Sequence, residues 1–293
     1  MSKRHQFLKK HLVFRKETIF VLIIAVFFLL YAFVVKDFII EDSKVLKVYS
    51  IYNYTGDCVD IHGKIFSMDP VSGKMNIKFW IEPKGNLYKN EFGKGLTKNL
   101  IVTITNLSGD MEYLLKKNKT INIISADIPL DGQSTNYPFD KFKSDLGIVV
   151  AEAENPSNLI PANIDLVENI QGFEIKPQPH IVSYPNTILL TINSARSGTL
   201  KSVAVSGIIL MWAMAIAVIF MTLTFTTKNY KVESLAFYSA LLFALVGFRN
   251  SLPETPPIGT LSDYVGFFWV MGIVSIMMIL KIIILLRRAP IAG

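Results

Sequence analysis

Four long apolar runs flank or follow a central region of alternating residues. The runs are Ile19–Val35, Val203–Phe225, Leu235–Phe248 and Tyr264–Leu286. A helix rises about 1.5 Å per residue, so about 20 apolar residues cross a hydrocarbon layer of roughly 30 Å. The first, second and fourth runs therefore predict membrane-spanning helices. The third is short for a bilayer, and we interpret it as a short span shielded by its neighbours, with a re-entrant or interior helix as the alternative.

Basic residues predict which side of the membrane each connection faces. Lys and Arg are concentrated before the first run, at Lys228 and Lys231, and at Arg287 and Arg288. Short loops rich in these residues stay in the cytoplasm. Four spans place all three basic segments on that side, whereas three spans would put the C-terminal arginines outside. Lys281, near the end of the fourth run, is expected to keep its stem in lipid and its ammonium at the interface.

The region between the first two runs has the period of two that β-strands show. The clearest case is residues 74–81, where apolar residues alternate with other residues at every second position. Such alternation is typical of strands with one buried face. Further strands are expected at 57–62, 100–105, 120–126, 146–153, 173–176 and 187–192, and a short helical piece at 111–116. About 160 residues suffice for one domain, and we predict a small antiparallel β-sandwich.

The predicted fold class is membrane α+β, an extracytoplasmic antiparallel β-sandwich with one transmembrane helix before it and three after it. The first helix is expected to be an uncleaved anchor, since no small-residue cleavage site follows it. The expected segments are a basic cytoplasmic tail (1–18), helix one (19–40), the sandwich (41–200), helix two (201–226), a cytoplasmic loop (227–233), helix three (234–249), an extracytoplasmic Pro-rich loop (250–263), helix four (264–286) and a cytoplasmic tail (287–293).

Composition agrees with a membrane protein and excludes several other classes. The 293 residues are 51% hydrophobic and 18% charged, beyond the usual range of soluble enzymes and disordered tails. The net charge of +7 is not a nucleic-acid patch, because residues 41–200 hold 16 basic and 18 acidic residues and the excess lies beside the apolar runs. The single cysteine, Cys58, excludes an internal disulfide, and we expect it to be buried and inert.

Common catalytic signatures do not occur. The sequence has no P-loop, no strand-linked GxGxxG, no GxSxG, no HExxH and no CxxC. Four histidines, His62 and His180 among them, show no metal-ligand spacing. We therefore expect no enzyme activity, no metal and no cofactor.

Two clusters carry more information. The first is the turn-rich segment that ends in Tyr137, Pro138, Phe139 and Asp140, which Pro138 shapes by restricting the backbone before it. Its simplest interpretation is an aromatic corner packed under a turn that Asp140 caps.

The second cluster joins the third and fourth runs. It contains Arg249, Asn250 and Pro253, then two further prolines, then Asp263. Its simplest interpretation is a rigid hairpin in which Asp263 caps the fourth helix or lies in its first turn.

These motifs and their order resemble an uncharacterised family of bacterial integral membrane proteins, catalogued only as a domain of unknown function. The matching pieces are YPFD at 137–140, RNSLP at 249–253, PPIG at 256–259, and Asp263 followed by FFW at 267–269. The resemblance covers most of the chain and implies membrane residence without an activity.

A more local resemblance is to pentameric ligand-gated ion channels. Their β-sandwiches carry a loop similar to YPFD, which rests on a loop resembling SLP with a later Asp. The matching pieces here are Tyr137–Asp140, Arg196, Ser251–Pro253 and Asp263. This sequence departs from the channels in having a helix before the sandwich, no final channel span, no cysteine pair around the loop, and an aromatic segment where the pore helix would be.

From these observations we expect a non-enzymatic protein of the bacterial cytoplasmic membrane, with both termini inside and an outer β-domain that binds or senses something and is coupled to the helices. The alternative is an oligomeric channel-like or transport protein. Expected partners are the lipid bilayer and either a homo-oligomer or a membrane partner protein, with no nucleic acid. We further hypothesise that Asp140 pairs with Arg196 or Arg249. The expected coupling residues are Tyr137, Pro138, Phe139, Asp140, Arg196, Arg249, Asn250, Pro253 and Asp263.

Overall fold

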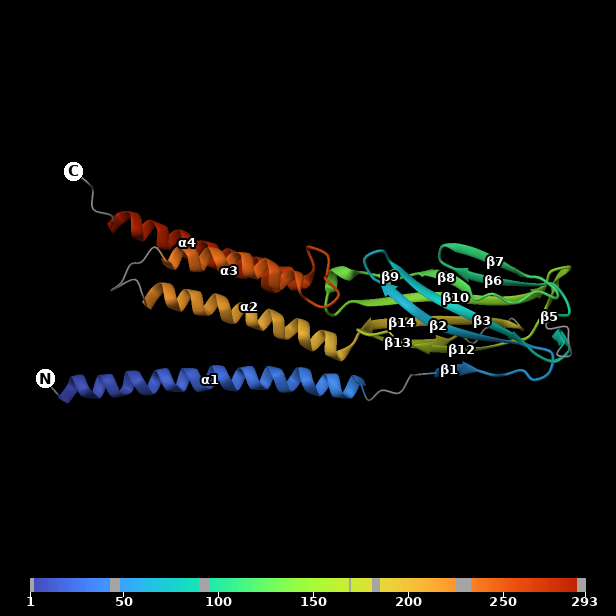
Figure 1. The fold of residues 1–293 in the computed structure, drawn as a ribbon, viewed down its shortest axis with the longest axis horizontal. Helices are drawn as coiled ribbons and strands as arrows, with labels where there is room; N and C mark the ends of the chain where they lie inside the picture. Colours follow the sequence, from blue (N-terminus) through green and yellow to red (C-terminus); the bar gives the residue numbers. More distant parts are fainter. Residues whose placement is uncertain are drawn as a thin grey trace.

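The structure is a computed structural model that describes residues 3–42, 48–89, 95–168, 170–180, 185–224 and 233–288. The molecule is elongated, with four helices at one end and the β-sheets at the other (Figure 1). The expected basic segments lie largely outside the description, since residues 225–232 and 289–293, and the side chains of residues 1–20, are not covered. The expectation of a β-rich region followed by apolar helices is confirmed.

Two sheets make up the β-domain. The five-stranded sheet has the order β1 (Val48–Ile51), β12 (Ala162–Glu168), β2 (Val59–Asp69), β3 (Lys74–Pro83), β8 (Ile124–Pro129). The second sheet has the order β13 (Phe173–Pro179), β14 (Thr187–Arg196), β10 (Lys141–Glu152), β6 (Leu100–Asn106), β7 (Gly109–Leu115), with β9 (Asp131–Gly132) and β11 (Asn155–Leu159) also paired to β10. A small ribbon joins β4 (Tyr88–Lys89) to β5 (Gly95–Leu96).

The two sheets bury a common hydrophobic core. In β3 the residues Met75, Ile77, Phe79 and Ile81 are all buried, as the alternation predicted. They belong to the same core cluster as buried residues of β10 and β14. Each sheet therefore supplies one apolar face to a shared interior, which is the packing of a sandwich.

Three details of the sheets correct the expectations. β12 runs parallel to β2, so the domain is not purely antiparallel. A parallel partner needs a long crossover, and the chain between β2 and β12 supplies it by passing through the other sheet. Residues 111–116, expected as a short helix, lie almost entirely in β7, and the strand expected at 120–126 is displaced to Ile124–Pro129.

The helices are α1 (Lys3–Asp42), α2 (Gly198–Thr224), α3 (Glu233–Asn250) and α4 (Phe268–Arg288), the last preceded by a π-helical turn, η3 (Asp263–Phe267). Among the described residues two helices are long and apolar enough to cross a membrane, Gly198–Leu223 and Asp263–Arg287. Leu235–Asn250 is a shorter apolar helix. Length and composition thus support two of the four expected spans.

The helices α2, α3 and α4 bury a second core of their own, which includes Met211, Leu245 and Val270. Lys281 is buried in the protein, which corrects the expectation that its stem lies in lipid. Its position on α4 follows Val270 and Val274 at helical spacing, so it shares their inward face. An almost uniformly apolar helix gives no polar face from which this orientation could be read.

The core assignment predicts unequal effects for two phenylalanines of the five-stranded sheet. Phe79 is buried between the sheets, whereas Phe66 is exposed beneath Lys78. Phe79→Ala is expected to lower the free energy of unfolding by about 3–5 kcal/mol, because it leaves a cavity. Phe66→Ala, the matched control, is expected to cost less than about 1 kcal/mol. Denaturant unfolding of the full chain in micelles measures both, and equal losses would contradict the shared core.

Candidate functional site

The residues expected to couple the domain to the helices meet where the sheets end. β14 ends at Arg196 and α2 begins at Gly198, so a single residue, Ser197, separates strand from helix. The Ser197 hydroxyl accepts a hydrogen bond from the Leu200 backbone N–H (3.2 Å), which caps the helix. The Ser197 N–H in turn donates to the Gly172 carbonyl (2.8 Å), at the turn before β13. The connection between β14 and α2 is therefore short, and hydrogen bonds fix it at both ends.

Asp140 pairs with Arg196, one of the two partners hypothesised for it. The Arg196 Nε–H donates to both Asp140 carboxylate oxygens at 3.1 Å, and both side chains are buried. Burial raises the pKa of Asp140 above its ordinary value, although the Arg196 charge and hydrogen bond oppose the change. Each charge is the ion-pair partner of the other, so removal of either leaves the other buried without that partner.

Two aromatic rings flank the Arg196 guanidinium. Its carbon lies 4.5 Å from the centroid of the Phe173 ring and 5.3 Å from that of Tyr137. Such cation–π contacts strengthen when water is excluded. The Arg196 Nη1 has no hydrogen-bond partner among the described residues. The described contacts of the Arg196 guanidinium group are those with Asp140 and the two rings.

Tyr137 connects the β-domain to the helical core. Its ring is fully buried and belongs to the cluster formed by α2, α3 and α4. Its hydroxyl donates a hydrogen bond to the Pro253 carbonyl (2.8 Å), in the loop after α3. Burial raises the pKa of Tyr137, so the neutral donor is favoured. One side chain of the domain thus occupies the helical core and holds the Pro-rich loop.

Arg249 pairs with Asp263 rather than with Asp140. Arg249 Nε and Nη2 donate to the two Asp263 oxygens at 2.9 Å each, and Nη2 also donates to the Pro257 carbonyl (2.8 Å). Asp263 Oδ2 accepts further bonds from the backbone N–H groups of Gly259 (2.8 Å) and Thr260 (3.3 Å). This buried bidentate pair closes the loop from the end of α3 to the start of η3.

The other expected coupling residues are less involved. Pro138 is buried, but Phe139 is 53% exposed, so the expected corner holds only one of its two aromatic rings. Asn250 is exposed. Asp140, expected as a turn cap in the simplest interpretation, instead faces Arg196.

A cavity of about 500 Å³ lies beside the junction. α1 contributes Phe38 and Glu41, β13 contributes Phe173, and α2 contributes Leu200. Glu41 also accepts a hydrogen bond from the Thr199 backbone N–H (3.2 Å), at the start of α2. This hydrogen bond joins the C-terminal end of α1 to the N-terminal end of α2, beside the β-domain.

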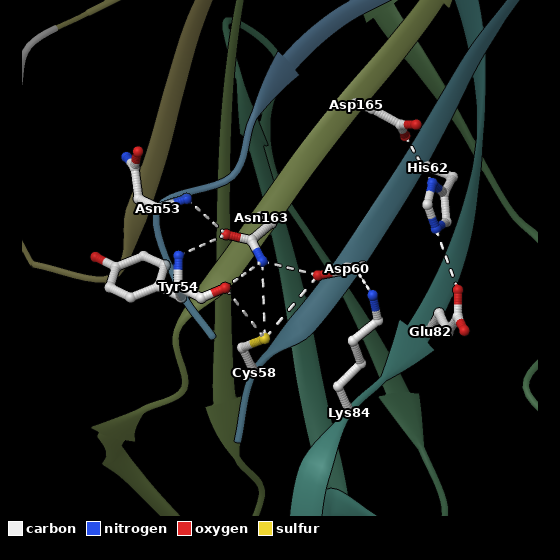
Figure 2. A network of polar contacts seen from close by, with 9 residues as sticks. All are labelled: Asn53, Tyr54, Cys58, Asp60, His62, Glu82, Lys84, Asn163 and Asp165. Carbon is white, nitrogen blue, oxygen red and sulfur yellow. Dashed lines mark hydrogen bonds and ion pairs between the residues drawn. The ribbon is translucent and has the colours of Figure 1, made fainter. Parts of the chain in front are cut away.

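A second polar cluster lies at the end of the sheets away from the helices, and sequence reasoning missed it. Figure 2 shows its members: Asn53, Tyr54, Cys58, Asp60, His62, Glu82, Lys84, Asn163 and Asp165. We call this group the distal cluster.

Asn163 fastens the segment after β1 to the distal cluster. Its Oδ1 accepts the backbone N–H groups of Asn53 (3.0 Å) and Tyr54 (3.1 Å), while its Nδ2 donates to the Tyr54 carbonyl (3.1 Å) and to Asp60 (2.8 Å). Figure 2 shows these bonds radiating from one amide. Every polar atom of this buried side chain is used, so the amide fixes the segment against the sheet.

Asp60 is buried beneath the ammonium of Lys84, with which it forms an ion pair. Burial alone would raise the pKa of Asp60, but the hydrogen bonds from Lys84 and Asn163 outweigh it and the pKa is lowered. Cys58 lies 4.0 Å from the same carboxylate, and burial and Asp60 raise the pKa of its thiol. A thiol with a raised pKa is a poor nucleophile, consistent with an inert Cys58.

His62 links three strands on the outer surface of the distal cluster. Its Nδ1 lies 2.7 Å from Asp165 of β12, and its Nε2 lies 3.4 Å from Glu82 of β3. The two carboxylates face opposite ring nitrogens, so they do not converge on a point where an ion could bind (Figure 2). Among the described residues no three His, Cys, Asp or Glu side chains form a metal-binding group.

The sequence contained only a partial indication of the distal cluster. Alternation places Asp60 and His62 on the outward face of a strand. The alternation does not show whether such a polar residue is open to water or covered by other parts of the chain. Asp60 is covered, because Lys84 and Asn163 contact it. Asn163 lies in β12 and Lys84 directly follows β3, and only the register of these strands with β2 brings both side chains to Asp60.

The Asp140–Arg196 pair predicts a strongly non-additive mutant cycle. Asp140→Leu or Arg196→Met alone is expected to lower the free energy of unfolding by about 3–5 kcal/mol, since each leaves a buried charge. The double variant is expected to lose clearly less than the sum. Lys143→Gln, the control, removes the cation of an exposed pair with Asp145 and is expected to cost at most about 1 kcal/mol. Additive losses in denaturant unfolding would show that the pair is not coupled.

Two family models match the chain, and both are described only as domains of unknown function. One, domain of unknown function DUF4436, matches residues 50–190, and the other, domain of unknown function DUF8686, matches residues 196–288. No curated protein matches the chain. The first match covers most of the β-domain, and the second covers α2, α3 and α4 from Arg196 onward. The chain is thus similar to uncharacterised protein domains over both of its parts, and neither similarity supplies an activity.

Proposed function

We propose that this chain is a non-enzymatic integral membrane protein of the bacterial cytoplasmic membrane, in which an outer β-domain binds or senses a partner and is coupled to a helical bundle. The observation that carries the proposal is the position of Tyr137, a residue of the β-domain whose ring is part of the helical core. A change in the β-domain that moves this ring must also move the helices or open their packing.

The proposed topology has four spans. The lengths and apolar character of α2 and α4 support two of them. The apolar run within α1 and the basic residues around 228–231 support the remaining two, because positive loops stay in the cytoplasm. The β-domain and the Pro-rich loop of residues 250–263 then share the outer side, and the Tyr137–Pro253 bond joins them there.

The arrangement of polar residues in the bundle favours coupling over conduction. The hydroxyls of Thr222 and Tyr238 lie 2.6 Å apart in the bundle interior, and both side chains are buried. They therefore bond to each other within one chain. A pore would use such groups to line a water-filled path.

If the β-domain is coupled to the helices, a small change in Tyr137 should alter the stability of the loop between α3 and α4. Tyr137→Phe removes the bond to the Pro253 carbonyl and leaves that acceptor without the hydroxyl, at an expected cost of about 1–3 kcal/mol. Hydrogen exchange of the full chain in micelles is expected to quicken at residues 250–263. Phe139→Ala, which alters the exposed neighbouring ring, is expected to leave that loop unchanged. Unchanged exchange at 250–263 in Tyr137→Phe would refute the coupling.

The four-span topology predicts which sites are reached from outside the cell. In a Cys58→Ser background, Ser125→Cys on β8 and Ile258→Cys in the Pro-rich loop are both at exposed positions. Both are expected to react with a membrane-impermeant maleimide in intact cells, whereas Lys231→Cys is expected to react only after permeabilisation. Labelling of Ser125→Cys but not Ile258→Cys would show that α3 does not span.

A further inference from the structure

The cavity beside the junction has an acidic lining. Its volume of about 500 Å³ lies within the range of roughly 300–1,000 Å³ that small-molecule sites have. No lysine, arginine or histidine of the described residues lines it, whereas five carboxyl groups do. The five belong to Glu41, Asp42, Glu168, Glu174 and Glu254. A hollow lined by charges of one sign concentrates ligands of the opposite sign, so this one favours cations.

The basic side chains around the cavity leave part of this negative charge uncompensated. Lys176 Nζ lies 3.4 Å from Glu174, so that carboxylate has a cation of its own. Arg196 pairs with Asp140, and the charge of Lys201 also acts on Asp140. The carboxyl groups of the lining that form no ion pair within the described residues are those of Glu41, Asp42 and Glu254.

These three carboxyl groups come from two separate segments. Glu41 and Asp42 lie at the C-terminal end of α1, and Glu254 lies in the Pro-rich loop after α3. Asp42 and Glu254 are exposed, so a dissolved ligand can reach them. No three acidic, His or Cys side chains of the described residues gather closely enough to hold a metal ion. Two separate acidic ends suit a ligand whose positive charges are held apart.

The first turn of α2 lies between the two acidic ends. On one side, Glu41 accepts the hydrogen bond from the Thr199 backbone N–H. On the other side, Leu200 and Glu254 both lie beside Gly172: a Cβ built on this glycine would be 3.2 Å from Leu200 Cδ1 and 3.7 Å from Glu254 Oε1. A ligand that reaches both ends must therefore cross the apolar side chain of Leu200.

Two hydroxyl groups on this turn keep unused hydrogen-bonding capacity. Thr199 Oγ1 is inaccessible to solvent and has no hydrogen-bond partner among the described residues. Ser197 is 2% exposed, and its oxygen accepts only the Leu200 N–H in the described part of the chain. Both residues line the cavity. Buried polar atoms without a partner are rare in proteins, and an ammonium group, which only donates, would supply the missing one.

We propose that this cavity binds an aliphatic diamine or polyamine. One ammonium group pairs with Glu41 or Asp42, another pairs with Glu254, and the methylene groups between them lie across Leu200 and Val203. Glu41 is already held by its bond to α2, which lowers the entropic cost of binding. The site lies beside the junction, away from the outer face of the β-domain, so the inference goes beyond the proposed function.

A series of α,ω-diamines with three to eight carbons tests the proposal on the full chain in non-ionic micelles. Isothermal titration calorimetry is expected to show an affinity that peaks at one chain length, because the two acidic ends are fixed. The best diamine is expected to bind at least about tenfold more tightly than the alkylamine of the same length, which has one ammonium group. Equal binding of the two, or affinity that only rises with chain length, would overturn the proposal.

The acidic ends are tested by replacing one carboxyl group at a time. Glu41→Gln and Glu254→Gln preserve side-chain size, and each is expected to weaken the best diamine about fivefold. Glu112→Gln is the matched control, since it removes an exposed carboxyl group from β7, and it is expected to leave binding unchanged. Equal weakening by all three would mean non-specific attraction and would overturn the site. Circular dichroism checks folding, and the exposed Glu254 keeps the test informative if Glu41→Gln is unfolded.

Two other occupants have distinct signatures. Displacement of the best diamine by an equal concentration of Mg²⁺ would indicate a site for simple cations and overturn the proposal. Lys44 and Lys47 belong to residues 43–47, outside the described residues. If the chain binds no diamine but the double variant Lys44→Gln, Lys47→Gln does, the chain's own lysines are the occupant, which also overturns it. Faster exchange at residues 250–263 in Tyr137→Phe would still support the coupling after either result.

Discussion

A charge pair withdrawn from water at the base of the sheets constrains the rest of this molecule. Asp140 comes from the segment before β10, and Arg196 is the last residue of β14. Neither charge can leave without stranding the other in a buried site. One residue after Arg196 the chain enters α2, and three residues before Asp140 the Tyr137 ring enters the helical core. The pair therefore lies directly beside the two connections between the β-domain and the helices, and it fixes their positions relative to each other.

The polar residues at the junction and those of the distal cluster differ in how many polar groups remain exposed to solvent. At the junction, carboxylates and guanidinium groups are buried and paired, so the site holds parts together and presents little to a ligand. At the far end of the sheets, Asp60 and Asn163 are buried, whereas Trp80 and Glu82 in the same region are exposed. A rigid support beneath an exposed surface suits recognition, whereas a desolvated network suits transmission. The proposed function uses this division, with binding at the exposed end and anchoring at the buried one.

The likeness to ligand-gated channels concerns the junction. It implies a YPFD loop resting on an SLP loop, and here Tyr137 donates a hydrogen bond to the Pro253 carbonyl. It also implies a pore, whereas the hydroxyls of Thr222 and Tyr238 bond to each other within the bundle. A shared local motif does not imply a shared function, because function depends on the whole site.

The sequence by itself determined the strands with one buried face, such as residues 74–81, and the strongly apolar helices α2 and α4, because periodicity and length are local properties. It also identified Tyr137, Asp140, Arg196, Arg249 and Asp263, since charged and aromatic residues beside apolar runs are conspicuous. Only the tertiary structure decided that Asp140 pairs with Arg196 and Arg249 with Asp263, that β12 lies parallel to β2, and that Asn163 meets Asp60. These choices depend on register and on which distant segments share a face, and such long-range geometry leaves no periodic trace in the chain.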